Sequence, residues 1–164
     1  MSYVTFYRGD PEHAPKTTLP AHLGSNVIIT WENKILLERR RDSDSWGLPG
    51  GGVKKWETGR EAAAREIYEE LGLRIPKEQF RKLAVYGEPG RIAAYQDGSI
   101  WRMVIVVYEL KLTRKPVLRI SEESKELRFF TREEIAGIDI PVTHSDIVQE
   151  QFTDRPEELF ENNV

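Results

Sequence analysis

The stretch GGVKKWETGREAAAREIYEELGL, residues 51–73, decides the fold and joins a glycine-rich start to a strongly helical segment. Thr58 followed by Glu61 forms a capping box, the pattern that begins a helix. Consecutive alanines at 62–64 favour a helix, and Gly72 suits the position just beyond its last turn. The stretch therefore predicts a loop that leads directly into one well-defined helix.

One side of this predicted helix carries three carboxylates within a single turn. At about 100° per residue, Glu66, Glu69 and Glu70 fall on one side, and the other side is apolar enough to pack on a sheet. Close carboxylates destabilise a helix and raise one another's pKa. Either solvent and neighbouring arginines screen them, or Mg²⁺ or Mn²⁺ neutralises them, since these ions bind carboxylates together with substrate phosphates.

Three neighbours of these carboxylates complete a candidate metal site. Glu57 directly precedes the helix and can reach back toward the cluster, and the loop around Gly51 leaves backbone carbonyls open to a metal. Arg65 lies beside Glu61 and Glu69, where it can hold carboxylates in fixed rotamers. A helix face rich in Glu and Arg is by itself usually just exposed to solvent. Whether this face is a metal site or a solvated surface therefore depends on the rest of the segment.

Length and composition restrict the class of protein. The chain has 164 residues, which suits one domain, and its 39% hydrophobic and 31% charged residues are ordinary for a globular protein. A net charge of −3 does not support a nucleic-acid partner bound by bulk positive charge. Cysteine is absent, which excludes disulfides and cysteine nucleophiles and is compatible with the cytoplasm, the location we expect. No apolar run approaches the roughly 20 residues of a membrane span, so we expect no membrane association.

Strand patterns flank the helix on both sides. Residues 1–23 predict an N-terminal arm, irregular from residue 8, before a single domain at 24–164. Hairpins are predicted around the turns at 32–34 and 96–98, a short helix after Thr131, and a last helix over 143–160. Further strands are expected at 81–88 and 126–130. This order indicates an α/β (α+β) fold in which helices pack on a mixed sheet.

The complete segment resembles the motif of the Nudix hydrolase family. Its form is G-x5-E-x7-R-E-U-x-E-E-x-G-U, where U is a bulky apolar residue, and the matching residues are Gly51, Glu57, Arg65, Glu66, Ile67, Glu69, Glu70, Gly72 and Leu73. The resemblance implies an α/β/α sandwich with a mixed sheet. It also implies Mg²⁺-dependent hydrolysis of a nucleoside diphosphate linked to another group, by attack of water on phosphorus.

The resemblance further implies roles for individual residues. Those expected to act in catalysis or to bind Mg²⁺, for which Mn²⁺ can substitute, are Gly51, Glu57, Arg65, Glu66, Glu69 and Glu70. The family draws its general base from different places, either a glutamate of the motif or one from a later loop. Here the later candidates are Glu122, Glu123 and Glu126, and we assign Glu126 to the site.

Substrate identity depends on residues outside the motif. In family members that act on ADP-ribose a proline often lies about sixteen residues beyond the motif, and Pro89 has this spacing, although a plain turn explains it equally well. Arg39, Arg40 and Arg41 end a strand near the expected cleft and are candidates for phosphate contacts, against the simpler interpretation of a solvated strand end. Of these, we assign Arg39 and Arg41 to the site. Trp46 is a candidate for stacking on the base, against core packing.

Several alternatives remain open. ADP-ribose or a related nucleotide sugar is the favoured small nucleotide substrate, with nucleoside triphosphates as the alternative and RNA ends disfavoured by the acidic charge. A nucleotide-sensing domain without activity is disfavoured because such domains usually lose motif carboxylates. Isopentenyl-diphosphate isomerase shares the fold but relies on a cysteine, which this chain lacks. The N-terminal arm suits a homodimer by analogy only. The histidines (His13, His22 and His144) show no metal-binding or triad spacing and receive no role.

Overall fold

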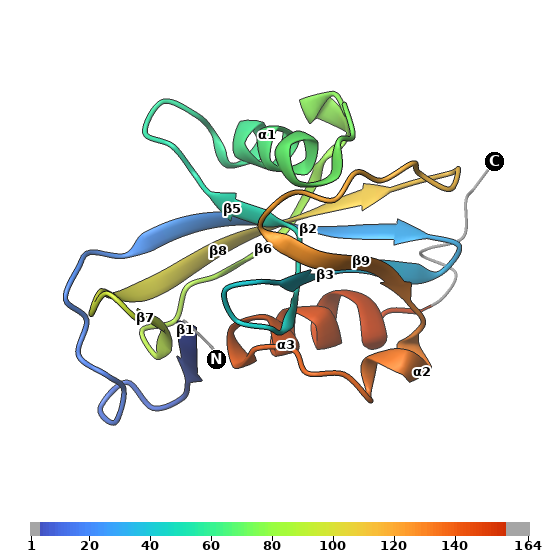
Figure 1. Cartoon of the computed structure of the whole chain (residues 1–164). Helices are drawn as coiled ribbons and strands as arrows, with labels where there is room; N and C mark the ends of the chain where they lie inside the picture. The colour runs from blue at the N-terminus through green and yellow to red at the C-terminus, as the bar shows by residue number, and fades with distance from the viewer. Residues whose placement is uncertain (1–3, 157–164) are drawn as a thin grey trace.

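A computed structural model of the chain describes residues 4–156, which form a curled mixed sheet with helices on both faces (Figure 1). In this part of the chain the nine strands are β1 (Val4–Arg8), β2 (His22–Trp31), β3 (Lys34–Arg40), β4 (Trp46–Gly47), β5 (Gly50–Gly52), β6 (Arg81–Tyr86), β7 (Arg91–Tyr95), β8 (Ile100–Lys111) and β9 (Ser124–Phe130). The helical segments are α1 (Gly59–Leu71), η1 (Lys77–Gln79), α2 (Arg132–Ile135), α3 (Val142–Val148) and the π-helical turn η2 (Gln149–Thr153).

The centre of the sheet is the parallel pair β2 and β8. The strand order is β1-β7-β8-β2-β3-β4, while β5 pairs with β2, β6 with β8 and β9 with β3, all antiparallel. Both predicted hairpins are confirmed, β2–β3 and β7–β8. In the first, Glu32 and Asn33 have φ angles of 47° and 61°, the left-handed conformation that a tight hairpin turn requires.

Two apolar clusters hold the three layers together. On one face of the sheet, Ile67 and Leu71 of α1 pack against residues of β2, β3 and β8. On the other face, Ile147 of α3 and Phe152 of η2 pack against the same strands from below. Figure 1 shows α1 on one side of the sheet and α2 and α3 on the other, so the predicted α/β/α sandwich is confirmed.

Helix α1 begins and ends where the sequence predicts. Thr58 Oγ1 accepts a hydrogen bond from the Glu61 N–H at 3.1 Å, and the Glu61 carboxylate accepts one from the Thr58 N–H at 3.1 Å. Gly72 closes the helix with a φ of 73°. Glu70 differs from the prediction, because it is only 3% exposed and faces the sheet rather than lying wholly on the opposite side with Glu66 and Glu69.

The two ends of the chain depart partly from the predictions. The expected arm contains strand β1, which pairs with β7 from Val4 opposite Tyr95 to Arg8 opposite Arg91. Strand β1 therefore belongs to the sheet, and of the described part of the expected arm only the stretch between β1 and β2 is irregular. The last predicted helix is confirmed over α3 and η2 but stops after Thr153, and residues 157–164 lie outside the described residues. Within residues 4–156 no helix is long and apolar enough to cross a membrane.

Candidate active site

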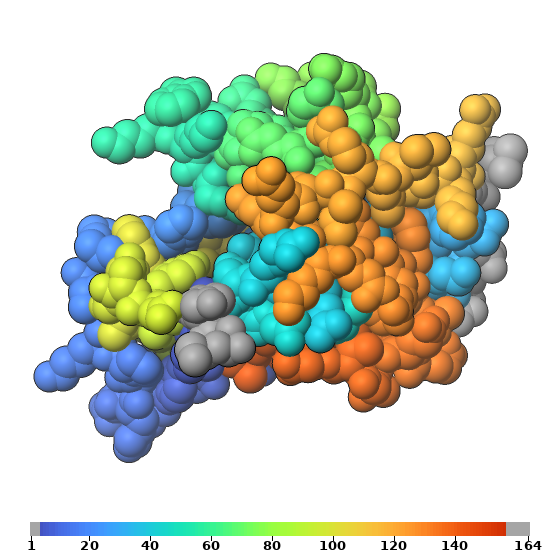
Figure 2. All heavy atoms as spheres, viewed as in Figure 1, coloured from blue at the N-terminus to red at the C-terminus, as the bar shows by residue number. Residues whose placement is uncertain are grey.

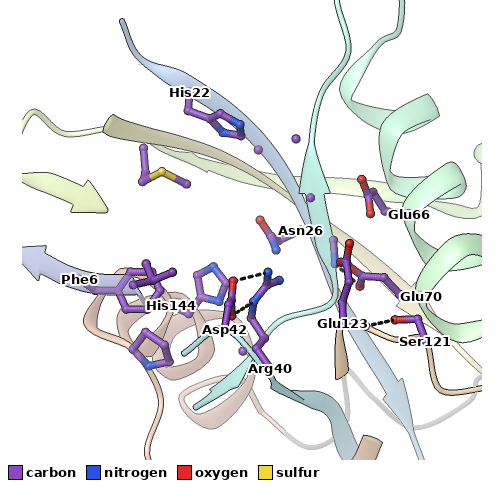
Figure 3. A pocket seen from close by; sticks show the side chains of 18 of the residues that line it. Phe6, His22, Asn26, Arg40, Asp42, Glu66, Glu70, Ser121, Glu123 and His144 are labelled. Atoms are coloured by element: carbon purple, nitrogen blue, oxygen red, sulfur yellow. Dashed lines mark hydrogen bonds and ion pairs between the residues drawn. The ribbon is translucent and has the colours of Figure 1, made fainter. Parts of the chain in front are cut away.

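A cavity of about 570 Å³ opens where β5, α1, the segment after β3 and the segment before β9 come together. The space-filling view shows the last two, in cyan and orange, side by side beneath the green α1 (Figure 2). Their contact is fixed by the backbone, since the Arg41 N–H donates to the Glu123 carbonyl at 3.0 Å. Glu66, Glu70 and Glu123 lie at one end of the cavity and Phe6 and His144 at the other, with Arg40 and Asp42 between them (Figure 3).

The carboxylate end is built by α1 packing directly on β5. Glu66 approaches Gly51 so closely that a Cβ on this glycine would lie 2.5 Å from Glu66 Oε1. Glu70 is buried, and its Oε2 accepts the Gly50 N–H at 3.0 Å. Burial and the neighbouring Glu38 carboxylate raise the pKa of Glu70 to about 10. Burial also raises the pKa of Glu66, although Arg65 opposes this shift.

Arg65 is the cation that links the glutamates of α1 to the loop before it. Its Nη2 donates to Glu57 Oε1 at 2.6 Å and to the Gly52 carbonyl at 2.9 Å. Its Nη1 reaches Glu66 at 2.8 Å and Glu69 at 3.2 Å. The hydrogen bonds from Arg65 to Glu57 lower the pKa of Glu57. Arg65 therefore contacts the glutamates that it was predicted to position. Glu57 is not among the residues that line the cavity.

The middle of the cavity carries a second guanidinium. Arg40 pairs with Asp42 through two hydrogen bonds of 2.9 Å, and its Nη1 lies 3.4 Å from Glu38 Oε1. Glu38 is buried and also accepts the Ser124 hydroxyl at 2.9 Å. Burial raises the pKa of Glu38. Burial opposes the charged form of Arg40 as well, but its carboxylate partners raise its pKa on balance, so it stays cationic.

Most of the chain matches a known domain family. The NUDIX domain model matches residues 20–151, which include every element around the carboxylate end. The chain belongs to the Nudix family. Its motif of residues 51–73 is the Nudix box, and the protein is a hydrolase acting on diphosphate bonds.

Three relatives of this Nudix chain bear on its substrate and fold. It is 31% identical over 109 residues to nucleoside triphosphatase NudI of Enterobacter sp. (strain 638), covering 65% of this chain and 76% of that one. It is 38% identical over 106 residues to an ADP-ribose pyrophosphatase of Methanocaldococcus jannaschii, covering 63% of this chain and 57% of that one. Among solved structures, a NUDIX hydrolase from Nitrosomonas europaea is 26% identical with a TM-score of 0.64, covering 88% of this chain and 77% of that one.

The predicted substrate contacts outside the Nudix box are not brought to the cavity. Strand β3 shifts register between Arg39 and Arg40, and Arg40 rather than its neighbours lines the cavity. Arg39 pairs with Asp44 at 3.1 Å, and Arg41 is exposed outside the lining. Trp46 is 9% exposed and packs edge-on against Phe130 with ring centroids 4.8 Å apart, so it is a core residue.

Pro89 and Glu126 also lie outside the cavity lining. Pro89 is exposed in the turn between β6 and β7, and the Arg91 N–H donates to the Glu88 carbonyl across this turn at 3.1 Å. This position agrees with the interpretation of Pro89 as part of a plain turn. Glu126 forms an ion pair with Arg128. Its neighbour Glu123 lines the cavity instead, so of the later-loop candidates Glu126 is not the one whose position suits a general base.

The cavity is also lined by residues to which the sequence assigned no role. His22, Asn26, Asp42 and His144 line the cavity, as does Phe6 of the supposed arm. Asn26 is buried in β2 directly before the apolar run that begins at Val27, and its Nδ2 donates to the Leu48 carbonyl at 3.1 Å, so an amide at the start of a predicted buried strand was a usable signal. The histidines gave no such signal, because their partners are distant in sequence.

The donor set at the carboxylate end fits a divalent cation. Within the described part of the chain no three His, Asp or Glu side chains already converge closely enough to hold a metal ion. Nevertheless Glu66, Glu69, Glu70 and the Gly51 backbone line one end of the cavity together. Burial is the first cause of the raised pKa values of Glu66 and Glu70, so the protein alone does not stabilise the two carboxylates in their charged form. A bound divalent cation would stabilise that form, and carboxylate and carbonyl oxygens are the ligands that Mg²⁺ and Mn²⁺ prefer.

Proposed function

We propose that this Nudix hydrolase cleaves the diphosphate bond of ADP-ribose or a related nucleotide sugar with the help of Mg²⁺. One observation carries the proposal: a single cavity has a carboxylate end and an aromatic, largely apolar end, with Arg40 between them. A nucleotide has the same order of parts, a base at one end and phosphates at the other. The similarity to the ADP-ribose pyrophosphatase of M. jannaschii supports this substrate class.

Each group has a definite part in the proposed reaction. Glu66, Glu69 and Glu70 would hold Mg²⁺, and the ion, when bound, would supply neutralisation of the diphosphate charge and a lower pKa for the attacking water. Arg40 donates hydrogen bonds to a phosphate oxygen. Glu123 removes a proton from the water as its oxygen bonds to phosphorus, and the bridging P–O bond breaks to leave two phosphorylated products.

The metal assignment predicts a selective loss in Glu70→Gln. The amide keeps the shape of the side chain but removes the charge that holds Mg²⁺, so kcat is expected to fall about a hundredfold or more with the fold retained. Turnover of ADP-ribose at saturating Mg²⁺, together with a circular dichroism spectrum, measures this. EDTA is expected to abolish wild-type activity and Mg²⁺ or Mn²⁺ to restore it. Wild-type turnover in the variant would refute the role of Glu70.

The general base is tested by a matched pair of variants. Glu123→Gln is expected to lower kcat by about 10²–10⁴-fold, because a positioned base contributes this much to a proton transfer. Glu126→Gln, three residues further on, removes a carboxylate that pairs with Arg128 outside the cavity and is expected to leave kcat unchanged. Equal rates in the two variants would exclude Glu123 as the base.

A second candidate substrate class is the nucleoside triphosphates, favoured by the similarity to NudI. A panel of ADP-ribose, nucleotide sugars, dinucleotides and triphosphates distinguishes the two classes by kcat/KM. The proposal expects the highest value for ADP-ribose or a nucleotide sugar. A clear preference for a triphosphate would replace the substrate while leaving the Nudix chemistry in place.

A further inference from the structure

The end of the cavity away from the carboxylates has a chemistry of its own. We propose that it is a nucleobase site, in which Phe6 stacks on the base and His144 donates a hydrogen bond from Nε2 to an acceptor on the base edge. The proposal rests on the proposed function in taking a nucleotide as the ligand. It makes Phe6 and His144 residues that determine substrate specificity.

Phe6 is presented to the cavity by strand pairing. It lies opposite Ala93 in the β1–β7 ladder, and the alternation of the strand places Val4 and Phe6 on the cavity side. The next residue, Tyr7, is not part of the lining, and its hydroxyl donates to the Asp10 carbonyl at 2.9 Å. β1 is anchored at its end, since Arg8 Nε donates to the Val142 carbonyl at 3.0 Å. The Phe6 ring is therefore held on a fixed strand, as a stacking surface requires.

His144 offers a hydrogen-bond donor in a defined tautomer. Its Nδ1 accepts the Leu48 N–H at 3.2 Å, so in the neutral ring the proton lies on Nε2. Among the described residues Nε2 has no hydrogen-bond partner, and the ring lines the cavity beside Phe6 (Figure 3). Burial, together with the nearby Arg40 and Arg91, lowers the pKa of His144 to about 4, so the ring is neutral near pH 7.

The surroundings of these two side chains favour a base over a sugar. Met103, Pro141 and Tyr95 also line the cavity. Tyr95 lies opposite Val4 of β1, the strand of Phe6, and Pro141 is the N-cap of α3, the helix of His144. A pentose or hexose needs many hydrogen-bonding partners, whereas a flat heteroaromatic ring needs apolar contact on its faces and a few polar groups at its edge. A base bound here leaves its ribose and phosphates facing Arg40 and the carboxylates, in agreement with the order of parts in a nucleotide.

The test is binding of nucleoside 5′-monophosphates, which carry no diphosphate bond to be cleaved. AMP, GMP, CMP and UMP are titrated into the full chain in Mg²⁺ buffer, with ribose 5-phosphate as the reference without a base. At least one nucleotide is expected to bind about tenfold or more tightly than ribose 5-phosphate. Phe6→Ala is expected to remove this advantage, while Tyr7→Ala, the matched truncation on the same strand, retains it. Equal binding by all five ligands, or equal effects of the two variants, overturns the proposal.

Two substitutions separate the functions of the His144 ring nitrogens. His144→Asn keeps an acceptor near the position of Nδ1 but has no donor at Nε2, whereas His144→Gln places an amide donor near Nε2 and gives up the acceptor for Leu48. We expect His144→Asn to weaken nucleotide binding about tenfold with little loss of thermal stability. We expect His144→Gln to bind the nucleotide more tightly than His144→Asn and to melt at a lower temperature. The opposite order of affinities overturns the assignment of Nε2.

The base site and the proposed hydrolysis fail in different ways. Selective binding of a monophosphate by a protein that leaves every diphosphate intact refutes the hydrolysis and supports the base site. Hydrolysis of ADP-ribose by a protein that binds no monophosphate better than ribose 5-phosphate refutes the base site and supports the hydrolysis.

Discussion

At the scale of single residues, the contact between Gly51 and Glu66 gives the sharpest prediction. A Cβ at position 51 would lie 2.5 Å from Glu66 Oε1, so Gly51→Ala forces the Glu66 carboxylate out of its position. We expect kcat/KM to fall about 10²-fold, since displacements of about 1 Å in an active site have this effect. Steady-state kinetics measure it, and Gly137→Ala is the control, because a Cβ there meets only the Glu134 carbonyl at 3.7 Å. Equal activity of both variants would contradict the importance of this contact.

The sequence predicted the site residues within the Nudix box more accurately than the cavity residues that other elements contribute. Within the Nudix box, Glu66, Glu69 and Glu70 all line the cavity, although Glu70 is turned further toward the sheet than the helical spacing predicts. Arg40 was one of three consecutive arginines considered for phosphate contact, and the sequence did not single it out, because its place in the lining depends on a register shift in β3. His144 was given no role, because its contact depends on the packing of a distant helix. Local periodicity predicts neighbours along one element, whereas contacts between elements depend on tertiary structure.

At the scale of elements, the capping box of α1 supports both the fold and the metal site. Thr58→Ala removes the hydroxyl that accepts the Glu61 N–H, and we expect the free energy of unfolding to fall by about 1 kcal/mol. Urea denaturation monitored by circular dichroism measures the change. Thr58→Ser keeps the hydroxyl and is expected to remain within about 0.5 kcal/mol of the wild type. A loss of the same size in both variants would show that the methyl group, not the cap, stabilises this helix.

Helices and strands with strong local sequence signals were predicted with the correct type. Their first and last residues were predicted less accurately. The capping boxes at Thr58 and Thr131 both form, as does the tight turn after β2. β1 was missed because its pairing partner is β7, far along the chain, and nothing within the first residues specifies that contact. The last predicted helix ends at Thr153, and among the described residues beyond it, 154–156, none is helical. Helical composition continues beyond Thr153, but composition alone does not hold a helix without an apolar face to pack.

At the scale of the whole molecule, His144 links the α3 layer to the segment between β4 and β5, and this link depends on its staying neutral. Burial lowers the pKa of His144 to about 4, whereas an unfolded histidine takes up its proton near pH 6.5. Between these values the unfolded chain binds more protons, so acidification favours unfolding. The stability associated with a neutral His144 is therefore complete above about pH 6.5 and is lost progressively as the pH falls toward 4, by up to about 3 kcal/mol.

The comparison with His144→Asn isolates this contribution from the other titrating groups. Burial raises the pKa of Glu38 and of Glu70, and such carboxyls act in the opposite direction, because they favour the folded state as they take up protons. Only the difference between two pH profiles, each measured by urea denaturation from pH 7.5 to 4, belongs to His144. We expect the stability of the wild type to fall more steeply on acidification than that of His144→Asn. His13→Asn, at an exposed position, is expected to follow the wild type; parallel profiles for all three proteins would show that protonation of His144 does not oppose folding.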